Sequence, residues 1–252
     1  MSLKPFFSAV RFLTILPIPE SWCGDEADFY RSPDWYPVVG LGIGLALVVL
    51  DSLLCWLLPV PVASVLLLLA MITISGALHL DGLADSADAF FSSRGREEML
   101  EIMKDSRSGP MGVAAIVIIL LLKLMLLISL PAEWRWQTIL LLPLAGRCSL
   151  SLVSSWLPYA RSTGTAEFTG HEQNWHRPVL SIAAIFIISF LLLGGVAGMI
   201  ISILVVISIW LLGSYSRRKI GGFTGDILGA ICELVELVPM FGVVILTQLG
   251  GM

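Results

Sequence analysis

The sequence predicts an all-α integral membrane protein, a bundle of about seven transmembrane helices preceded by an interfacial helix. Three observations support this fold class. Hydrophobic residues make up 57% of the 252 residues and charged residues only 13%, and the mean hydropathy is +0.91. The apolar residues form runs about as long as a bilayer requires, with short polar segments between them. Because no soluble domain of this length has such a composition, we interpret residues 1–252 as one membrane-embedded domain.

The first apolar segment, residues 4–19, is too short to cross a bilayer and lacks the cleavage site of a signal peptide. It carries Lys4 and Arg11 beside aromatic and aliphatic side chains, which is typical of a helix lying in the headgroup plane. Residues 20–35 are polar and acidic, and we expect them to form a solvated connector.

The spanning segments are expected from Tyr36 onward. The apolar run from Pro178 to Gly213 is too long for one span. It is divided at Gly194-Gly195, either into two short spans or into one span and a re-entrant segment. The seven predicted spans are residues 36–58, 62–80, 113–130, 138–157, 179–194, 196–213 and 228–248.

The distribution of Lys and Arg predicts the orientation. With the N-terminus on the cytoplasmic side, Arg135 is the one basic residue in an outer loop. Lys123 and Arg147 fall within spans, and all other Lys and Arg residues lie in inner segments. This bias follows the positive-inside rule and predicts that the polar segments, about residues 79–112 and 217–236, face the cytoplasm.

Three carboxylates, those of Asp81, Asp85 and Asp88, follow directly on the second predicted span. Their spacings of four and three place them within about 60° of arc on a helix. Carboxylates this close repel one another, and a shared divalent cation is the simplest relief. The apolar residues between them argue against an ordinary solvated helix end. The pattern therefore favours a membrane enzyme that acts on phosphates.

Two further clusters are predicted at the same membrane face. Glu101 and Asp105 are four residues apart, and cationic and hydroxyl side chains surround them. The segment Gly221–Asp226 leads into the last span, which itself contains Glu233 and Glu236. Acidic residues within a span are costly unless they are paired, so these two require compensation by a metal or by a basic residue such as Arg147.

These residue types together suit phosphoryl transfer, which needs cations around the phosphate oxygens and a positioned hydroxyl nucleophile. Carboxylates hold Mg²⁺, and Arg and Lys bind phosphates directly. His79 precedes the first aspartate and has two interpretations, a hydrogen bond within the bundle or a ligand contact. The basic residues with phosphate-binding potential are Arg94, Arg96, Lys104 and Arg107.

Three motifs carry a resemblance to a known family. They are His79-Leu-Asp-Gly-Leu-Ala-Asp-Ser-Ala-Asp88, Leu100-Glu-Ile-Met-Lys-Asp-Ser-Arg-Ser-Gly109 and Gly221-Gly-Phe-Thr-Gly-Asp226. With the order of the spans, they resemble the cobalamin synthase family, the adenosylcobinamide-GDP ribazoletransferases of the bacterial inner membrane. Ala89 stands where the family often has glycine, a departure that leaves the carboxylates intact.

The resemblance implies an Mg²⁺-dependent transferase of the cell inner membrane, with its active site facing the cytoplasm. Such an enzyme joins adenosylcobinamide-GDP to α-ribazole, or to α-ribazole 5′-phosphate, and releases GMP in a late step of cobalamin (vitamin B12) biosynthesis. Its expected partners are these substrates and membrane lipid, without nucleic acid. The sequence leaves the oligomeric state open, a homo-oligomer included.

The resemblance also suggests roles for individual residues. One aspartate doubles as a general base for the attacking hydroxyl. The expected catalytic residues are Asp81, Asp85, Asp88 and Asp105, and the expected metal ligands are the same four with Asp226. The expected substrate-binding residues are His79, Arg94, Lys104, Ser106, Arg107, Thr224 and Asp226.

Two alternatives fit part of the pattern. A CDP-alcohol-type phosphotransferase or a polyprenyl transferase also uses intramembrane aspartates with Mg²⁺, but with other spacings and without a counterpart of Lys104-Asp-Ser106. A transporter would suit the break at Gly194-Gly195 and the acids within spans. Against a transporter, the sequence shows no internal repeat, and its charges gather at one membrane face instead of the midplane.

Overall fold

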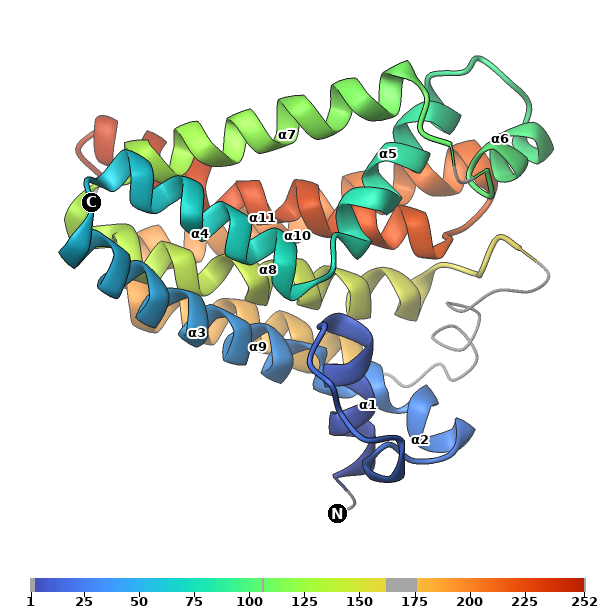
Figure 1. Ribbon diagram of the computed structural model, residues 1–252, viewed down its shortest axis with the longest axis horizontal. Coiled ribbons are helices and arrows are strands. Elements are labelled where there is room, and N and C mark those ends of the chain that lie inside the picture. The colour runs from blue at the N-terminus through green and yellow to red at the C-terminus, as the bar shows by residue number, and fades with distance from the viewer. Residues whose placement is uncertain (1–2, 106, 162–175, 252) are drawn as a thin grey trace.

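The computed structural model describes residues 3–105, 107–161 and 176–251, which form a helical bundle without β-strands (Figure 1). The chain begins with two short helices, α1 (Lys4–Leu13) and α2 (Glu26–Tyr30). The remaining helices are α3 (Tyr36–Leu57), α4 (Val60–Ile74), α5 (Leu78–Phe90), α6 (Arg96–Ile102), α7 (Pro110–Ser129), α8 (Arg135–Trp156), α9 (His176–Leu193), α10 (Gly195–Ile220) and α11 (Gly225–Gln248).

Six of these helices, α3 and α7 to α11, are long and apolar enough to cross a membrane, and α4 with α5 counts as a seventh span if the bent pair is taken together. The predicted polytopic bundle is therefore confirmed. The short N-terminal helix expected in residues 4–19 is α1.

The predicted continuous span at 62–80 is wrong. The helix ends at Ile74, and α5 leaves at an angle of 85°. Between them Gly76 and Ala77 both adopt the left-handed region, with φ values of 59° and 60°. The sequence pattern does not indicate this turn, because no Asp, Glu, Lys or Arg lies between Ile74 and Leu80 to mark a break.

The break at Gly194 separates two full helices. Gly194 has φ of 79°, a conformation that suits glycine, and α9 and α10 pack against each other as separate spans. The alternative with two spans is thus the correct one. Helix α10 continues past the predicted end at residue 213 to Ile220, so the basic run Arg217–Lys219 forms its last turn.

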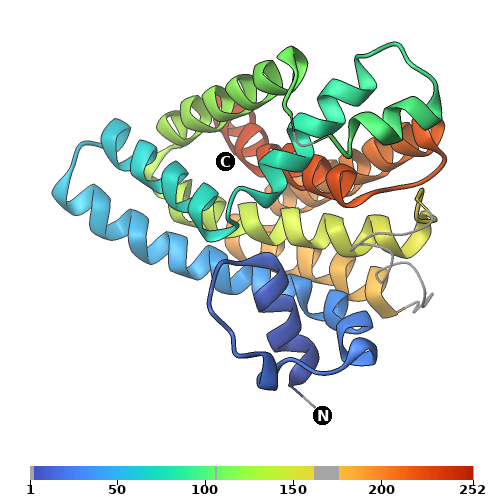
Figure 2. The same ribbon diagram turned by 45° about the vertical axis from the view of Figure 1, so that its right-hand side comes forward.

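Two helices form the centre of the bundle. In the most apolar stretch of α8, 94% of the residues are buried, and in that of α11, 78% are buried. The corresponding share is 28–33% for the other four single spans. Helix α8 packs on α3, α9 and α11, and α11 packs on α5, α7 and α10. Helices α5 and α6 lie at one end of the bundle with the start of α11, whereas the turns after α3 and α7 lie at the other end (Figures 1 and 2). The polar motifs are thereby gathered at one end.

Candidate active site

Helix α5 lies directly against the start of α11, and this contact builds the acidic site. A Cβ atom on Gly82 would lie 2.6 Å from the carbonyl oxygen of Asp226, so a side chain there would push the two helices apart. The close approach brings Asp226 to the acids of α5, and Asp85 lies within electrostatic range of Asp81, Asp88 and Asp226. Residues 81 and 226, far apart in sequence, therefore belong to one cluster.

The described part of the chain leaves two of these carboxylates unpaired. Asp81 is exposed and Asp85 is half-buried. Among the described residues neither makes a hydrogen bond or an ion pair. The oxygens of these two carboxylates therefore remain available as acceptors for a ligand.

Asp88 instead joins α5 to α7. One of its oxygens accepts a hydrogen bond from the backbone N–H of Gly109 at 2.6 Å, and the other accepts from that of Gly112 at 2.9 Å. Gly109 is the N-cap of α7, so the carboxylate satisfies amides that the helix leaves free and lies at the positive end of its dipole. A side chain at either glycine would collide with Asp88. Both positions therefore require glycine, because the Asp88 carboxylate occupies the space that a side chain would need.

Asp226 is paired with a residue that the sequence analysis counted only as an inner basic residue. Its carboxylate lies 2.7 Å from Nη2 of Arg161, and both side chains are largely buried. Arg161 Nε has no hydrogen-bond partner in the described part of the chain. Arg161 also acts electrostatically on Asp85, which makes it a cation of the acidic site.

A short bridge holds the segment before Arg161 in place. The N–H of Ala160 donates to the carbonyl of Phe223 at 2.8 Å, and the N–H of Phe223 donates to the carbonyl of Pro158 at 3.0 Å. Arg96 spans the same junction, because Nε donates to Ile220 O at 2.7 Å and Nη2 to Ala160 O at 3.3 Å. Arg96, a phosphate-binding candidate in the sequence, here binds backbone carbonyls.

Thr224 is the N-cap of α11. It is fully buried, and its Oγ1 accepts a hydrogen bond from the N–H of Ile227 at 3.3 Å. The same hydroxyl lies 3.3 Å from the Asp226 carboxylate and donates to it. Thr224 therefore fixes the start of the helix that carries Asp226.

Six charged residues in and around α6 form pairs within this segment. Arg94 lies 3.3 Å from Glu98, and Lys104 lies 2.7 Å from Glu101. The exposed Asp105 is 2.7 Å from Arg107, whose hydrogen bonds lower the pKa of that carboxyl to about 2. Ser106, a predicted substrate contact, lies outside the described residues.

His79 points into the bundle. It is 2% exposed, and its Nδ1 lies 3.7 Å from Sγ of Cys232 on α11. Its Nε2 has no hydrogen-bond partner among the described residues. The interior contact is therefore present in the structure, and the ligand contact stays a prediction.

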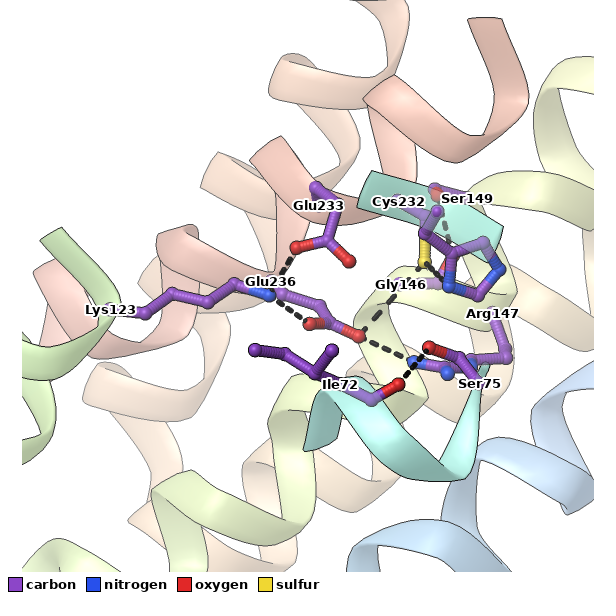
Figure 3. Close-up of polar contacts among 10 residues, drawn as sticks. Ile72, Ser75, Lys123, Gly146, Arg147, Ser149, Cys232, Glu233 and Glu236 are labelled. Atoms are coloured by element: carbon purple, nitrogen blue, oxygen red, sulfur yellow. Dashed lines mark hydrogen bonds and ion pairs between the residues drawn. The ribbon is translucent and has the colours of Figure 1, made fainter. Parts of the chain in front are cut away.

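A second charge cluster lies deeper, between α7, α8 and α11 (Figure 3). Nζ of Lys123 lies 2.6 Å from both Glu233 and Glu236, and Arg147 pairs with Glu236. All four side chains are at most 8% exposed. The expectation that Arg147 compensates an acid of the last span is confirmed, and Lys123 was missed.

The match to a family model covers nearly the whole chain. The model described as cobalamin-5-phosphate synthase matches residues 5–244. The chain belongs to the cobalamin-5-phosphate synthase family. All of the acids and Arg161 described above lie within the matched region.

Individual members of this family are similar over their full lengths. Proteins named adenosylcobinamide-GDP ribazoletransferase from Geotalea daltonii and from Pseudomonas fluorescens Pf-5 are 37% and 38% identical to the chain. The matches cover 99% of both chains for the former, and 96% of this chain and 99% of the relative for the latter. A third, from Pseudomonas putida GB-1, is 40% identical over 95% of this chain and 98% of its own. No solved structure matches the chain.

The acids of this cobalamin-5-phosphate synthase family member do not form a closed metal cage. Among the described residues no three His, Cys, Asp or Glu side chains are placed to hold one ion. Mg²⁺, however, commonly takes one or two carboxylates and completes its shell with water and substrate phosphates. The unpaired Asp81 and Asp85 fit this requirement, since their oxygens have no partner among the described residues.

Proposed function

We propose that this protein is an adenosylcobinamide-GDP ribazoletransferase, which joins adenosylcobinamide-GDP to α-ribazole or its 5′-phosphate and releases GMP in cobalamin synthesis. The observation that carries the proposal is a pair of carboxylates, Asp81 and Asp85, that have no partner among the described residues and lie near Arg161 in a chain of this family. The names of the full-length relatives supply the substrates.

The reaction forms one phosphate ester bond and breaks one pyrophosphate bond. A ribose hydroxyl of the ribazole attacks the phosphorus that bears the cobinamide arm and loses its proton. The bond from that phosphorus to the bridging oxygen breaks, and GMP leaves with the bond electrons. The protein must therefore orient the two reactants, accept one proton and stabilise negative charge on the phosphates.

Asp81 and Asp85 supply the acidic side of this chemistry. They would hold Mg²⁺, which when bound neutralises charge on phosphate oxygens. We assign the ion to these two acids because the other predicted ligands, Asp88, Asp105 and Asp226, already have partners. A carboxylate of the same pair accepts the proton of the attacking hydroxyl.

Arg161 supplies the cationic side. Its guanidinium can form paired hydrogen bonds to phosphate oxygens, and its Nε is without a partner among the described residues. Asp226 holds Arg161 at 2.7 Å, and the bridge to Phe223 fixes the segment that carries it. The pyrophosphate thus lies between Arg161 and the α5 acids. Arg94, Lys104 and Arg107 remain candidates for the outer part of the substrate.

We place this site on the cytoplasmic side of the cell inner membrane. The basic last turn of α10, Arg217–Lys219, lies at the same end of the bundle as the acids. This arrangement agrees with the positive-inside bias of the sequence.

The test is GMP release by the purified protein in nanodiscs. We expect release with adenosylcobinamide-GDP, a ribazole acceptor and Mg²⁺ together, and loss of release when the acceptor or Mg²⁺ is left out. Parallel reactions with α-ribazole and its phosphate identify the acceptor. Absence of release from protein that is monodisperse and melts cooperatively would overturn the proposal. Release without an acceptor would indicate a hydrolase instead.

A further inference from the structure

An apolar groove with a volume of about 420 Å³ lies between α7 and α10. Helix α7 packs on α4, α5 and α11, whereas α10 packs on α8, α9 and α11. The two helices are thus separated, and α11 forms the floor between them. Figures 1 and 2 show α7 along the edge of the bundle. The groove belongs to the membrane-spanning part of the protein.

The groove is distinct from the acidic site. Its residues on α5 include Leu83, Ala87 and Phe90. These recur with helical spacing on the side of α5 opposite to Asp81 and Asp85. On α7 the lining includes residues such as Ile118 that are exposed on the surface of the bundle. The groove therefore opens toward lipid, and the proposed transfer reaction does not use it.

A cation lies at the end of the groove nearest the polar segments. Nζ of Lys219 lies 3.5 Å from the carbonyl oxygen of Phe90 and 5.7 Å from the centre of the Tyr215 ring. The rings of Phe90 and Tyr215 line the groove and pack edge to face at 5.4 Å. Lys219 has no acidic partner among the described residues. An apolar channel thus ends at an uncompensated positive charge.

We propose that this groove binds an anionic phospholipid, with an acyl chain along α11 and the phosphate on Lys219. Apolar walls open to the bilayer suit an acyl chain, and rings with a lysine at the membrane interface suit the headgroup region. The charge selects the lipid class, because a zwitterionic headgroup presents no net negative charge to Lys219. The exposed Arg217 and Arg218 in the same helical turn add to the attraction.

The experiment is native mass spectrometry of the delipidated protein with added phosphatidylglycerol or phosphatidylcholine. We expect one retained phosphatidylglycerol and weaker retention of phosphatidylcholine. Lys219→Gln should lower the preference for phosphatidylglycerol about fivefold, the value of one interfacial basic residue. Arg218→Gln is the matched control, since it removes the same charge from the same turn, and among the described residues its side chain makes no hydrogen bond or ion pair. It should change the preference less.

A second pair of variants tests the groove itself. Ala115→Trp fills it and should remove the retained lipid, whereas Ala46→Trp adds the same side chain to an exposed position on α3 and should not. Equal retention of both lipids, or no retention by the wild type, overturns the proposal. So does a dimer that Ala115→Trp dissociates, because a second copy would then occupy the groove. If Ala115→Trp fails to fold, Lys219→Gln still decides, since glutamine removes the charge and keeps a polar side chain of similar size.

Discussion

The two acidic clusters of this protein differ in charge balance. In the deep cluster, Glu233 and Glu236 face Lys123 and Arg147, so the four charges cancel. At the end of the bundle, the four aspartates of α5 and α11 face one paired cation, Arg161, and two of them have no partner in the described chain. Both clusters contain acids on α11, only seven residues apart at Asp226 and Glu233.

The difference separates structure from chemistry. A buried charge must be compensated by the protein itself, and the deep cluster meets this condition completely. A site that binds a cation and phosphates must instead keep acceptors available until the ligand arrives. The presence of acids does not distinguish the two clusters, but their pairing does.

The largest effect is expected at Asp85. Asp85→Asn removes one unpaired charge with little change in shape, and we expect GMP release to fall by about 10³-fold, as for loss of a positioned acid–base or charge-stabilising group. The melting temperature should not fall, because Asp85 makes no hydrogen bond within the described part of the chain. Near-normal turnover would remove Asp85 from the site.

Glu236→Gln should act in the opposite manner. It leaves a buried positive charge uncompensated, and breaking such a pair costs about 3–5 kcal/mol. We expect a large fall in the melting temperature, with activity per folded molecule retained. The double variant Glu236→Gln with Arg147→Gln restores neutrality and should be more stable than the Glu236→Gln single variant. A double variant that is less stable would show that the cluster does not act through charge balance.

Sequence reasoning succeeded where the signal is local. Runs of apolar residues located the helices, and the spacing of Asp81, Asp85 and Asp88 placed them on α5. It failed at the 85° turn after Ile74, because the residues at that turn carry no charge that would mark a break in the helix. It also missed Arg161 and Lys123, since each meets its acid through contacts between helices far apart in sequence. The close contact of Gly82 with Asp226, which only the structure shows, explains why the motif from His79 to Asp88 contains a glycine.

A smaller effect is expected at Arg161. Arg161→Lys keeps the positive charge but loses the planar pair of donors, and such a change is not conservative at a phosphate site. We expect the KM for adenosylcobinamide-GDP to rise about tenfold, the equivalent of one good hydrogen bond to a charged group, with a lesser change in kcat. The matched variant Arg147→Lys, in the deep cluster, should lower the melting temperature and leave the KM unchanged. An effect of Arg161→Lys on stability alone would show that Arg161 has a structural role, as Arg147 does in the deep cluster.

The smallest effect is expected at Asp105, which the sequence pattern groups with the catalytic acids. It is exposed and bonded to Arg107. Because that bond lowers its pKa to about 2, the pair is intact at neutral pH and is lost only as the pH falls toward that value. Exposed pairs contribute little, so we expect Asp105→Asn to release GMP within about twofold of the wild type. The ratio of the two rates should not vary with pH near neutrality. A loss comparable to that of Asp85→Asn would show instead that Asp105 leaves Arg107 when substrate binds and completes the site, as its motif predicts. Pairing in the free protein would then not exclude an acid from the chemistry. Charge balance would identify a structural cluster only where its charges are also buried.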